Sequence, residues 1–107
     1  MPFYLVQASY SPQATAAMIK NPQDRAAAVR PVIERMGGKL HGLWFAFGEY
    51  DAVVIAEMPD NASAAAVAMA VGSSGGISAY RTTPLLTTAE AMEAMKRAGG
   101  AGYQAPK

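Results

Sequence analysis

Five side chains in the middle and later part of the chain are the ones best suited to chemistry: His41, Trp44, Tyr50, Asp51 and Arg81. An aspartate among apolar neighbours is costly to bury without a partner, so Asp51 is a candidate ligand anchor or proton acceptor. Trp44 is its predicted diagonal neighbour on the same face of a strand pair. A structural alternative remains, in which Asp51 caps a hairpin by accepting backbone N–H bonds, as aspartate often does in turns.

The single histidine, His41, could act as an acid, a base or a metal ligand near neutral pH. No spacing of His, Asp or Glu around it forms a recognised cluster, so we predict no metal site. In the predicted strand pairing His41 lies opposite Ala56, as a surface or interface residue. Arg81 has the planar fork that holds a carboxylate, but it could equally pair with Glu57, with Asp51 or with a partner chain.

Aromatic side chains are the other candidates for a binding site. They could line a pocket for a flat or apolar ligand, although core and interface positions are their commoner role. The set comprises Tyr4, Tyr10, Trp44, Phe45, Phe47, Tyr50 and Tyr80. No catalytic residue can be assigned, because no serine has a histidine at a recognisable spacing. The glycines of residues 72–76 lack the Lys-Ser/Thr of a phosphate loop, and the sequence implies no cofactor.

The composition favours a partner chain over nucleic acid. The 107 residues fit one domain. Only 16% are charged and 51% are hydrophobic, whereas globular proteins average roughly 25% charged residues. A small domain has much surface for its volume, so this shortage of charge predicts that part of the surface is buried against another copy. The net charge of +1 is spread without a basic stripe, which argues against nucleic-acid binding.

The chain carries no cysteine, which excludes disulfides and thiol chemistry. It shows no signal-peptide pattern and no run of about 18 apolar residues. We therefore expect a cytoplasmic protein without a membrane segment.

The elements that position these residues alternate between strands and helices. Strands are predicted over residues 3–10, 39–47, 50–58 and 77–83, from their β-branched and aromatic content. Helices are predicted over residues 12–20, from a restart at Asn21-Pro22 to Gly37-Gly38, over 62–71, and from Thr87 to about 98.

Local signals set the ends of these elements. Ser11 is a predicted cap for the first helix, and Thr87 with Glu90 forms a predicted capping box. Pro31 is expected to kink its helix, and Pro84 to end the last strand. Gly48-Glu49 suits a two-residue type II′ hairpin turn.

The order β-α-β-β-α-β is the ferredoxin-like arrangement. It predicts an α+β fold, with a four-stranded antiparallel sheet, helices on one face and an additional C-terminal helix. We assign residues 1–98 to the domain and residues 99–107 to a flexible tail.

Both faces of the central strand pair are mainly apolar. With the turn at 48–49, Trp44 pairs with Val53. One face then carries Leu40, Gly42, Trp44, Ala46, Asp51, Val53, Ile55 and Glu57, and the other carries His41, Leu43, Phe45, Phe47, Tyr50, Ala52, Val54, Ala56 and Met58. A sheet with one wet face normally alternates apolar and polar residues. Helices can cover only one face, so the sequence predicts a sheet-to-sheet dimer or larger homo-oligomer.

The alanine-rich helix at 62–71 is apolar all round, which indicates burial on more than one side. Its second apolar side is expected to lie under the terminal helix or against further subunits.

The segment Gly48-Glu49-Tyr50-Asp51, set between two apolar strands, resembles the signature of the GYD-domain family, here with Glu49 inserted between glycine and tyrosine. The resemblance extends from about Phe3 to Thr87. It implies a small bacterial protein with a dimeric α/β-barrel assembly, and it implies no catalytic residues. A similar Gly-x-Tyr-Asp hairpin occurs in the effector-binding domain of the Lrp/AsnC regulators, but the helix-turn-helix of those proteins is absent here.

The sequence thus leaves three functional hypotheses and does not decide whether the chain is an enzyme. The first is a small-molecule-binding or assembly module, with a pocket between helices and sheet or between subunits. The second is a cofactor-independent monooxygenase or haem-handling enzyme, by fold analogy alone. The third is a purely structural oligomer.

Overall fold

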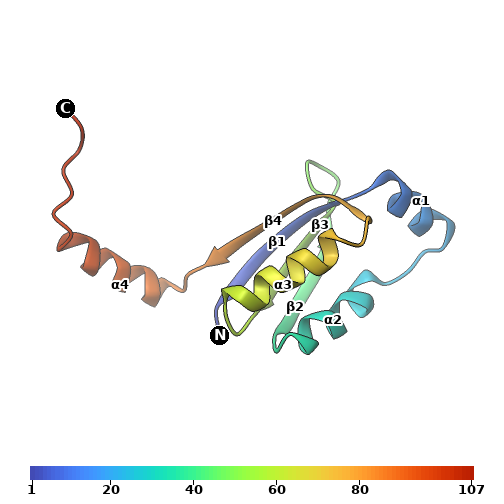
Figure 1. Ribbon diagram of the computed structural model, residues 1–107, viewed down its shortest axis with the longest axis horizontal. Helices are drawn as coiled ribbons and strands as arrows, with labels where there is room; N and C mark the ends of the chain where they lie inside the picture. Colours follow the sequence, from blue (N-terminus) through green and yellow to red (C-terminus); the bar gives the residue numbers. More distant parts are fainter.

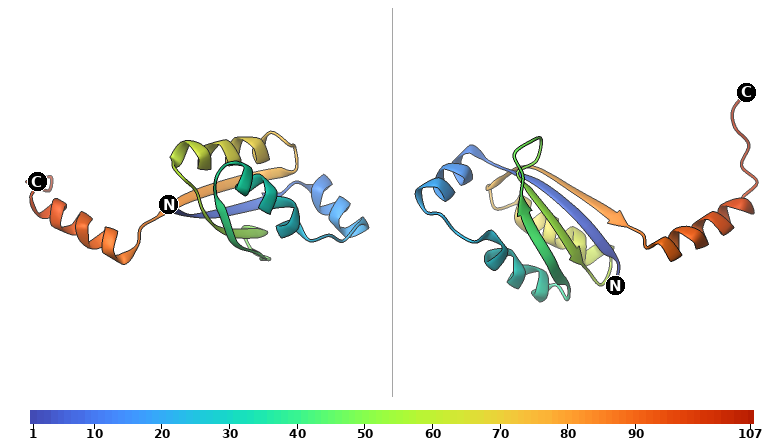
Figure 2. Two further views of the ribbon diagram at one scale, coloured as in Figure 1. Left: turned by 90° about the horizontal axis from the view of Figure 1, so that it is seen from below. Right: turned by 180° about the vertical axis from the view of Figure 1, so that it is seen from behind.

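The computed structural model describes all 107 residues and places four strands in one sheet. The elements are β1 (Phe3–Tyr10), α1 (Pro12–Lys20), α2 (Arg25–Arg35), β2 (Lys39–Phe45), β3 (Ala52–Glu57), α3 (Asn61–Gly72), β4 (Ile77–Leu85) and α4 (Thr88–Gly99). The sheet order is β2-β3-β1-β4 and every pair is antiparallel. Helices α2 and α3 lie on one side (Figure 1), and the view from behind shows no helix across the sheet (Figure 2). The predicted α+β fold with a four-stranded antiparallel sheet, consistent with the ferredoxin-like arrangement, is confirmed.

The core lies between the sheet and helices α2 and α3. Alternate residues of β1 and β3, such as Tyr4 and Val54, meet Ile33 of α2 and Val67 of α3. Tyr4 is 2% exposed, and its hydroxyl donates a hydrogen bond to Oδ1 of Asn61 at the start of α3. This bond and the surrounding apolar contacts fix α3 against the central strand.

Each helix begins at a side chain that caps its free N–H groups. Ser11 accepts from the backbone of α1, and Thr87 and Glu90 form the predicted capping box of α4. The predicted helix restart at Asn21-Pro22 is wrong, because α2 begins only at Arg25 and its cap is Asp24.

Two of the capping carboxylates titrate below their usual range. Accepting the backbone N–H of Ser63 lowers the pKa of Asp60, the cap of α3, and accepting that of Thr87 lowers the pKa of Glu90. Since both pKa values are lower in the folded chain, these caps stabilise their helices at neutral pH. The contribution is lost as the pH falls through the lowered values.

The connection between β2 and β3 is longer than predicted. Residues 46–51 form a loop, so β2 ends at Phe45 and β3 begins only at Ala52. Gly48 does not have the positive φ that a type II′ turn requires at this position. The prediction of a two-residue hairpin turn is therefore wrong.

The register of β2 changes partway along the strand. Trp44 pairs with Val53, as predicted. Nearer the start of β2, His41 is an extra residue in a bulge, and Leu40, not His41, pairs with Ala56. A bulge places two residues against one and reverses the side-chain alternation beyond it. Leu40 consequently lies in the core and His41 on the opposite face, so the predicted sides of both residues are wrong.

Two prolines lie inside elements. β4 continues through Pro84 to Leu85, although the sequence predicted an end at Pro84. β4 is an edge strand, where a missing N–H leaves no neighbouring strand unpaired. Helix α2 similarly continues through Pro31.

The C-terminal arm, residues 86–107, stands away from the rest of the molecule (Figures 1 and 2). The radius of gyration is 17.1 Å, compared with about 13 Å expected for a compact chain of this length. Helix α4 does not cover α3, whose Met69 is 74% exposed. The sequence predicted that α3 would be covered by the terminal helix or by further subunits. Within one chain the terminal helix does not cover it, so the first of these predictions is wrong. No helix combines the length and apolar character needed to cross a membrane.

Replacing Tyr4 with Phe removes the hydroxyl that bonds to Asn61 while keeping the buried ring. We expect the free energy of unfolding in urea to fall by about 1 kcal/mol, the typical net value of such a bond. Tyr10→Phe is the matched control, because the Tyr10 ring stacks on Phe45 and its hydroxyl makes no hydrogen bond within the chain. Equal stability of the two variants would contradict the assignment.

Candidate functional site

The structure divides the five predicted site residues between two places. His41, Trp44 and Arg81 belong to the face of the sheet that no helix covers, here called the open face. Tyr50 and Asp51 lie in the loop at residues 46–51, at one end of the sheet. None of the five lines the main cavity of the molecule, so they do not form a single pocket there.

The open face carries both apolar and polar side chains. Its strand residues are Phe3, Leu5, Gln7 and Ser9 of β1, Lys39, His41, Gly42 and Trp44 of β2, Val53, Ile55 and Glu57 of β3, and Ala79, Arg81, Thr83 and Leu85 of β4. Trp44 is 56% exposed, and a Cβ built on Gly42 would lie 2.6 Å from Cη2 of its indole. The indole therefore covers Gly42, and glycine is the residue type that leaves it room to lie against the sheet.

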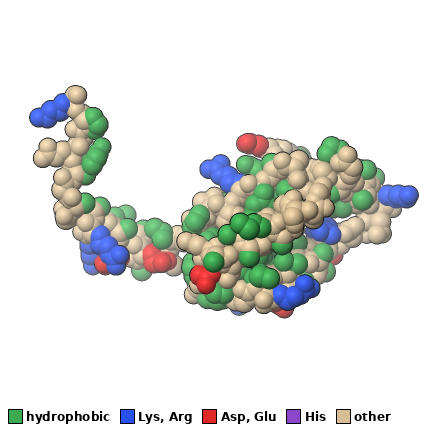
Figure 3. All heavy atoms as spheres, in the orientation of Figure 1, with side chains coloured by type: hydrophobic (Ala, Val, Ile, Leu, Met, Phe, Trp, Pro, Cys, Tyr) green, Lys and Arg blue, Asp and Glu red, His purple; other side chains and the backbone are tan.

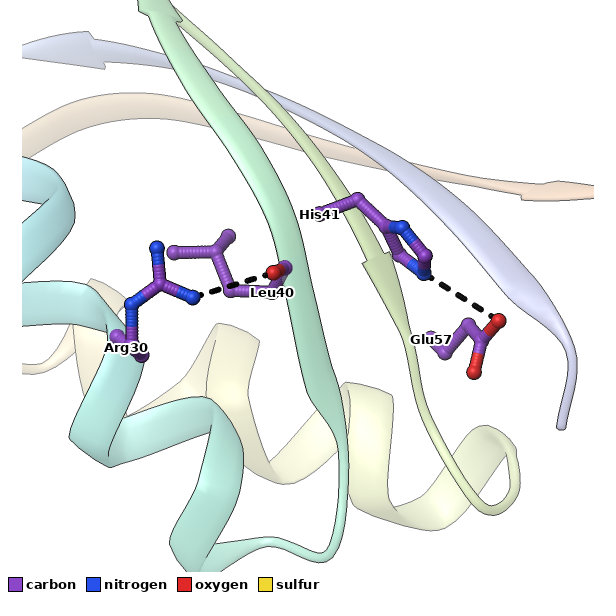
Figure 4. Close-up of polar contacts among 4 residues, drawn as sticks. All are labelled: Arg30, Leu40, His41 and Glu57. Atoms are coloured by element: carbon purple, nitrogen blue, oxygen red, sulfur yellow. Dashed lines mark hydrogen bonds and ion pairs between the residues drawn. The ribbon is translucent and has the colours of Figure 1, made fainter.

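His41 contacts one acidic side chain on the open face. Its Nε2 lies 3.3 Å from Oε1 of Glu57, and its ring centroid is 5.0 Å from that of Phe3. Figure 4 shows His41 directed across β3 towards Glu57, whereas Arg30 reaches β2 from helix α2 and donates to the carbonyl of Leu40. No group of three or more His, Cys, Asp or Glu side chains is placed to hold a metal ion.

The loop containing Tyr50 and Asp51 is held against β1 by three hydrogen bonds. The hydroxyl of Ser9 donates to the carbonyl of Glu49 at 3.0 Å, and the backbone N–H of Tyr10 donates to Oδ2 of Asp51 at 3.0 Å. The backbone N–H of Asp51 donates to the carbonyl of Ala8 at 2.9 Å. The carboxylate of Asp51 thus bonds to a neighbouring strand and not to its own hairpin, and it fixes where the loop lies.

A cavity of about 420 Å³ lies between the sheet and helices α1, α2 and α3, and we call it the helix-side cavity. Eighteen of its 22 lining residues are hydrophobic. Its walls include Val6, Ala8, Tyr10, Ala14, Ala17, Met18, Ala28, Val29, Val32, Leu43, Ala52, Val54, Val67, Ala70, Val71, Ile77 and Tyr80. Many of these are alanines, whose small side chains leave the space between helices and sheet unfilled.

Few polar groups reach this cavity. The polar lining side chains are Gln23, Arg25 and Ser74, together with the hydroxyls of Tyr10 and Tyr80. Burial raises the pKa of Tyr80, so its phenol stays protonated and able to donate at neutral pH. Nη1 of Arg25 donates to Oε1 of Gln23 at 2.8 Å, while its buried Nε has no partner.

Sequence reasoning found only part of this cavity. Of the seven aromatic candidates, Tyr10 and Tyr80 line it. Arg25 was missed, because the sequence predicted the helix start three residues too early and so gave Arg25 no special position. The one available signal was the density of alanine in the segments that became α2 and α3.

Asp51→Ala removes the acceptor for the Tyr10 N–H and leaves that partly buried donor unpaired. We expect the free energy of unfolding to fall by about 1–3 kcal/mol, the cost of losing a charged acceptor. Asp51→Asn keeps an acceptor oxygen and should lose clearly less in the same denaturant titration. Unchanged stability of Asp51→Ala would mean that the carboxylate does not hold the loop in solution.

Comparison with known proteins identifies the family. No curated protein matches the chain. The GYD domain matches residues 4–95, which include the sheet, α1 to α3 and most of α4. The Gly-x-Tyr-Asp segment noted in the sequence forms the 46–51 loop and the residues that tie it to β1. Because the match spans most of its length, the chain belongs to the GYD-domain family.

Proposed function

We propose that the protein is a binding module that holds a small, mainly apolar molecule in the helix-side cavity. The supporting observation is the cavity itself, which at about 420 Å³ lies within the range of roughly 300–1,000 Å³ found for small-molecule sites. Protein interiors are normally packed as densely as organic crystals. This hollow is partly open to solvent and is lined by side chains from three helices and the sheet, so a small molecule could enter it.

The chemistry of the lining favours binding over catalysis. The polar side chains in the cavity are an amide, a hydroxyl, two phenols and one guanidinium, with no carboxylate or imidazole among them. A general acid or base near neutral pH usually comes from histidine or a perturbed carboxyl group. The earlier alternatives of a monooxygenase-like or haem-handling enzyme gain no specific support from this site.

A second proposed role is self-association through the open face. Four strands spaced about 4.8 Å apart, with six to eight paired residues each, present a flat footprint of about 460 Å². Stable dimers usually bury about 800 Å² per partner. The open face alone is therefore small for a stable interface, and a further contact surface is needed.

The C-terminal arm supplies such a surface. Leu86, Met92 and Met95 are 64%, 57% and 69% exposed, and Figure 3 shows hydrophobic side chains at the surface of the arm. An isolated helix of 12 residues is marginal in water without packing. The arm also follows directly from Leu85, which lies on the open face. We propose that each arm packs against the second copy of the chain, next to the paired open faces.

Ala52→Leu adds bulk to the buried floor of the helix-side cavity, since Ala52 is 3% exposed. We expect binding of the uncharged fluorescent probe N-phenyl-1-naphthylamine to weaken at least about tenfold through overlap with the added side chain. Ala65→Leu, on the exposed side of α3 and outside the cavity, is the matched control and should bind like the native chain. Equal binding by both variants would place the probe elsewhere, and no binding by the native chain would refute the proposal.

Trp44→Glu places a charge on the edge strand β2 of the open face, where Trp44 is 56% exposed. We expect the native chain to sediment as a dimer at micromolar concentration and this variant to dimerise at least about 100-fold more weakly, as for loss of an interface hot spot. Phe47→Glu is the control, because Phe47 is fully exposed in the 46–51 loop, outside the sheet. A native chain that sediments as a monomer would refute the assembly.

A further inference from the structure

We infer that the molecule bound in the helix-side cavity is an apolar acid whose carboxylate pairs with Arg25. The inference rests on the proposed function, because it specifies the ligand class for that cavity. Arg25 is the single charged residue among the 22 that line the cavity.

Arg25 is half-buried, and its guanidinium has one unmet hydrogen bond. One of its nitrogens, Nη1, donates to Gln23, but Nε is buried and has no partner. A buried donor without an acceptor costs free energy, and more so when it carries charge. Because Nε is closed off in this conformation, a ligand carboxylate would have to draw the guanidinium round before an oxygen could meet Nε and remove that cost.

No acid of the protein forms an ion pair with Arg25. Neither of the two ion pairs in the molecule includes it. The nearest acid in sequence, Asp24, is occupied in accepting the N–H groups of Ala26 and Ala27. The positive end of the α2 dipole lies at the same place, since Arg25 is the first residue of this 11-residue helix. Asp24 keeps its negative charge at the same helix start, but among the residues that line the cavity Arg25 has no counter-ion.

The number and type of donors favour a carboxylate. A guanidinium offers planar, paired donors that match the two oxygens of a carboxylate. One cation balances a monoanion and leaves a dianionic phosphate half neutralised. The hydrophobic remainder of the lining then requires an apolar body behind the acid group.

Displacement of N-phenyl-1-naphthylamine by octanoate and by octanamide, which share a shape and differ in charge, tests the inference. We expect the native chain to bind octanoate more tightly than octanamide. In Arg25→Met the affinity for octanoate should fall about 10- to 100-fold, the range expected for loss of a charged hydrogen bond. The affinity for octanamide should change less than about threefold, and Arg25→Lys should recover part of the loss.

The outcomes separate the two proposals. If octanamide displaces the probe at least as well as octanoate, or if Arg25→Met weakens both equally, the cavity binds apolar molecules but the acid preference is wrong. If neither the probe nor octanamide binds the native chain, the proposed function fails and the acid preference fails with it. Circular dichroism of each variant confirms that α2 remains folded without the arginine.

Discussion

β1 has hydrogen-bonded neighbours along both edges, β3 on one and β4 on the other, and the other parts of the domain are positioned from it. At one end, the backbone of Ala8 and Tyr10 holds the 46–51 loop through Asp51. Immediately after the strand, Ser11 caps α1 with its hydroxyl and donates its backbone N–H to the carbonyl of Gly76, 2.8 Å away. The central strand therefore fixes the β2–β3 loop, the first helix and the segment that leads into β4.

The same strand separates two different surfaces. Side chains on its helix side, including Val6 and Ala8, form the floor of the cavity, whereas Leu5 and Gln7 lie on the open face. A ligand enclosed by the helices and a second copy on the sheet would thus contact opposite sides of the same backbone. This arrangement allows binding and assembly to occur together, because neither surface is used by the other.

The sequence predicted the fold well where local signals and tertiary packing agree. The element order and the capping box at Thr87 follow from patterns a few residues long. The pairing of Trp44 with Val53 is correct, although the two-residue turn from which it was predicted does not form. The bulge at His41 could not be predicted in this way, because an extra residue in a strand leaves the apolar content of the segment unchanged. Pro84 was misread because its effect depends on whether a strand lies at the edge, which is a property of the whole sheet.

The candidate site, too, could be predicted only in part from local sequence patterns. The predicted site residues share polar or aromatic chemistry, but the cavity arises from what is missing, namely side-chain volume at positions such as Ala52 and Ala70. The volume of the cavity depends on how three helices pack against the sheet, and no sequence motif predicts that packing. The significance of Arg25 likewise depends on the neighbours it lacks, which only the packed structure reveals.

The position of the indole over Gly42 has a spectroscopic consequence. The chain contains one tryptophan, and this residue lies on the open face and outside the lining of the helix-side cavity. Its intrinsic emission is therefore a site-specific signal: a blue shift on raising the protein concentration reports that water has left the open face. Small molecules that enter the cavity do not touch the indole, so the two processes can be followed separately in one sample by light alone.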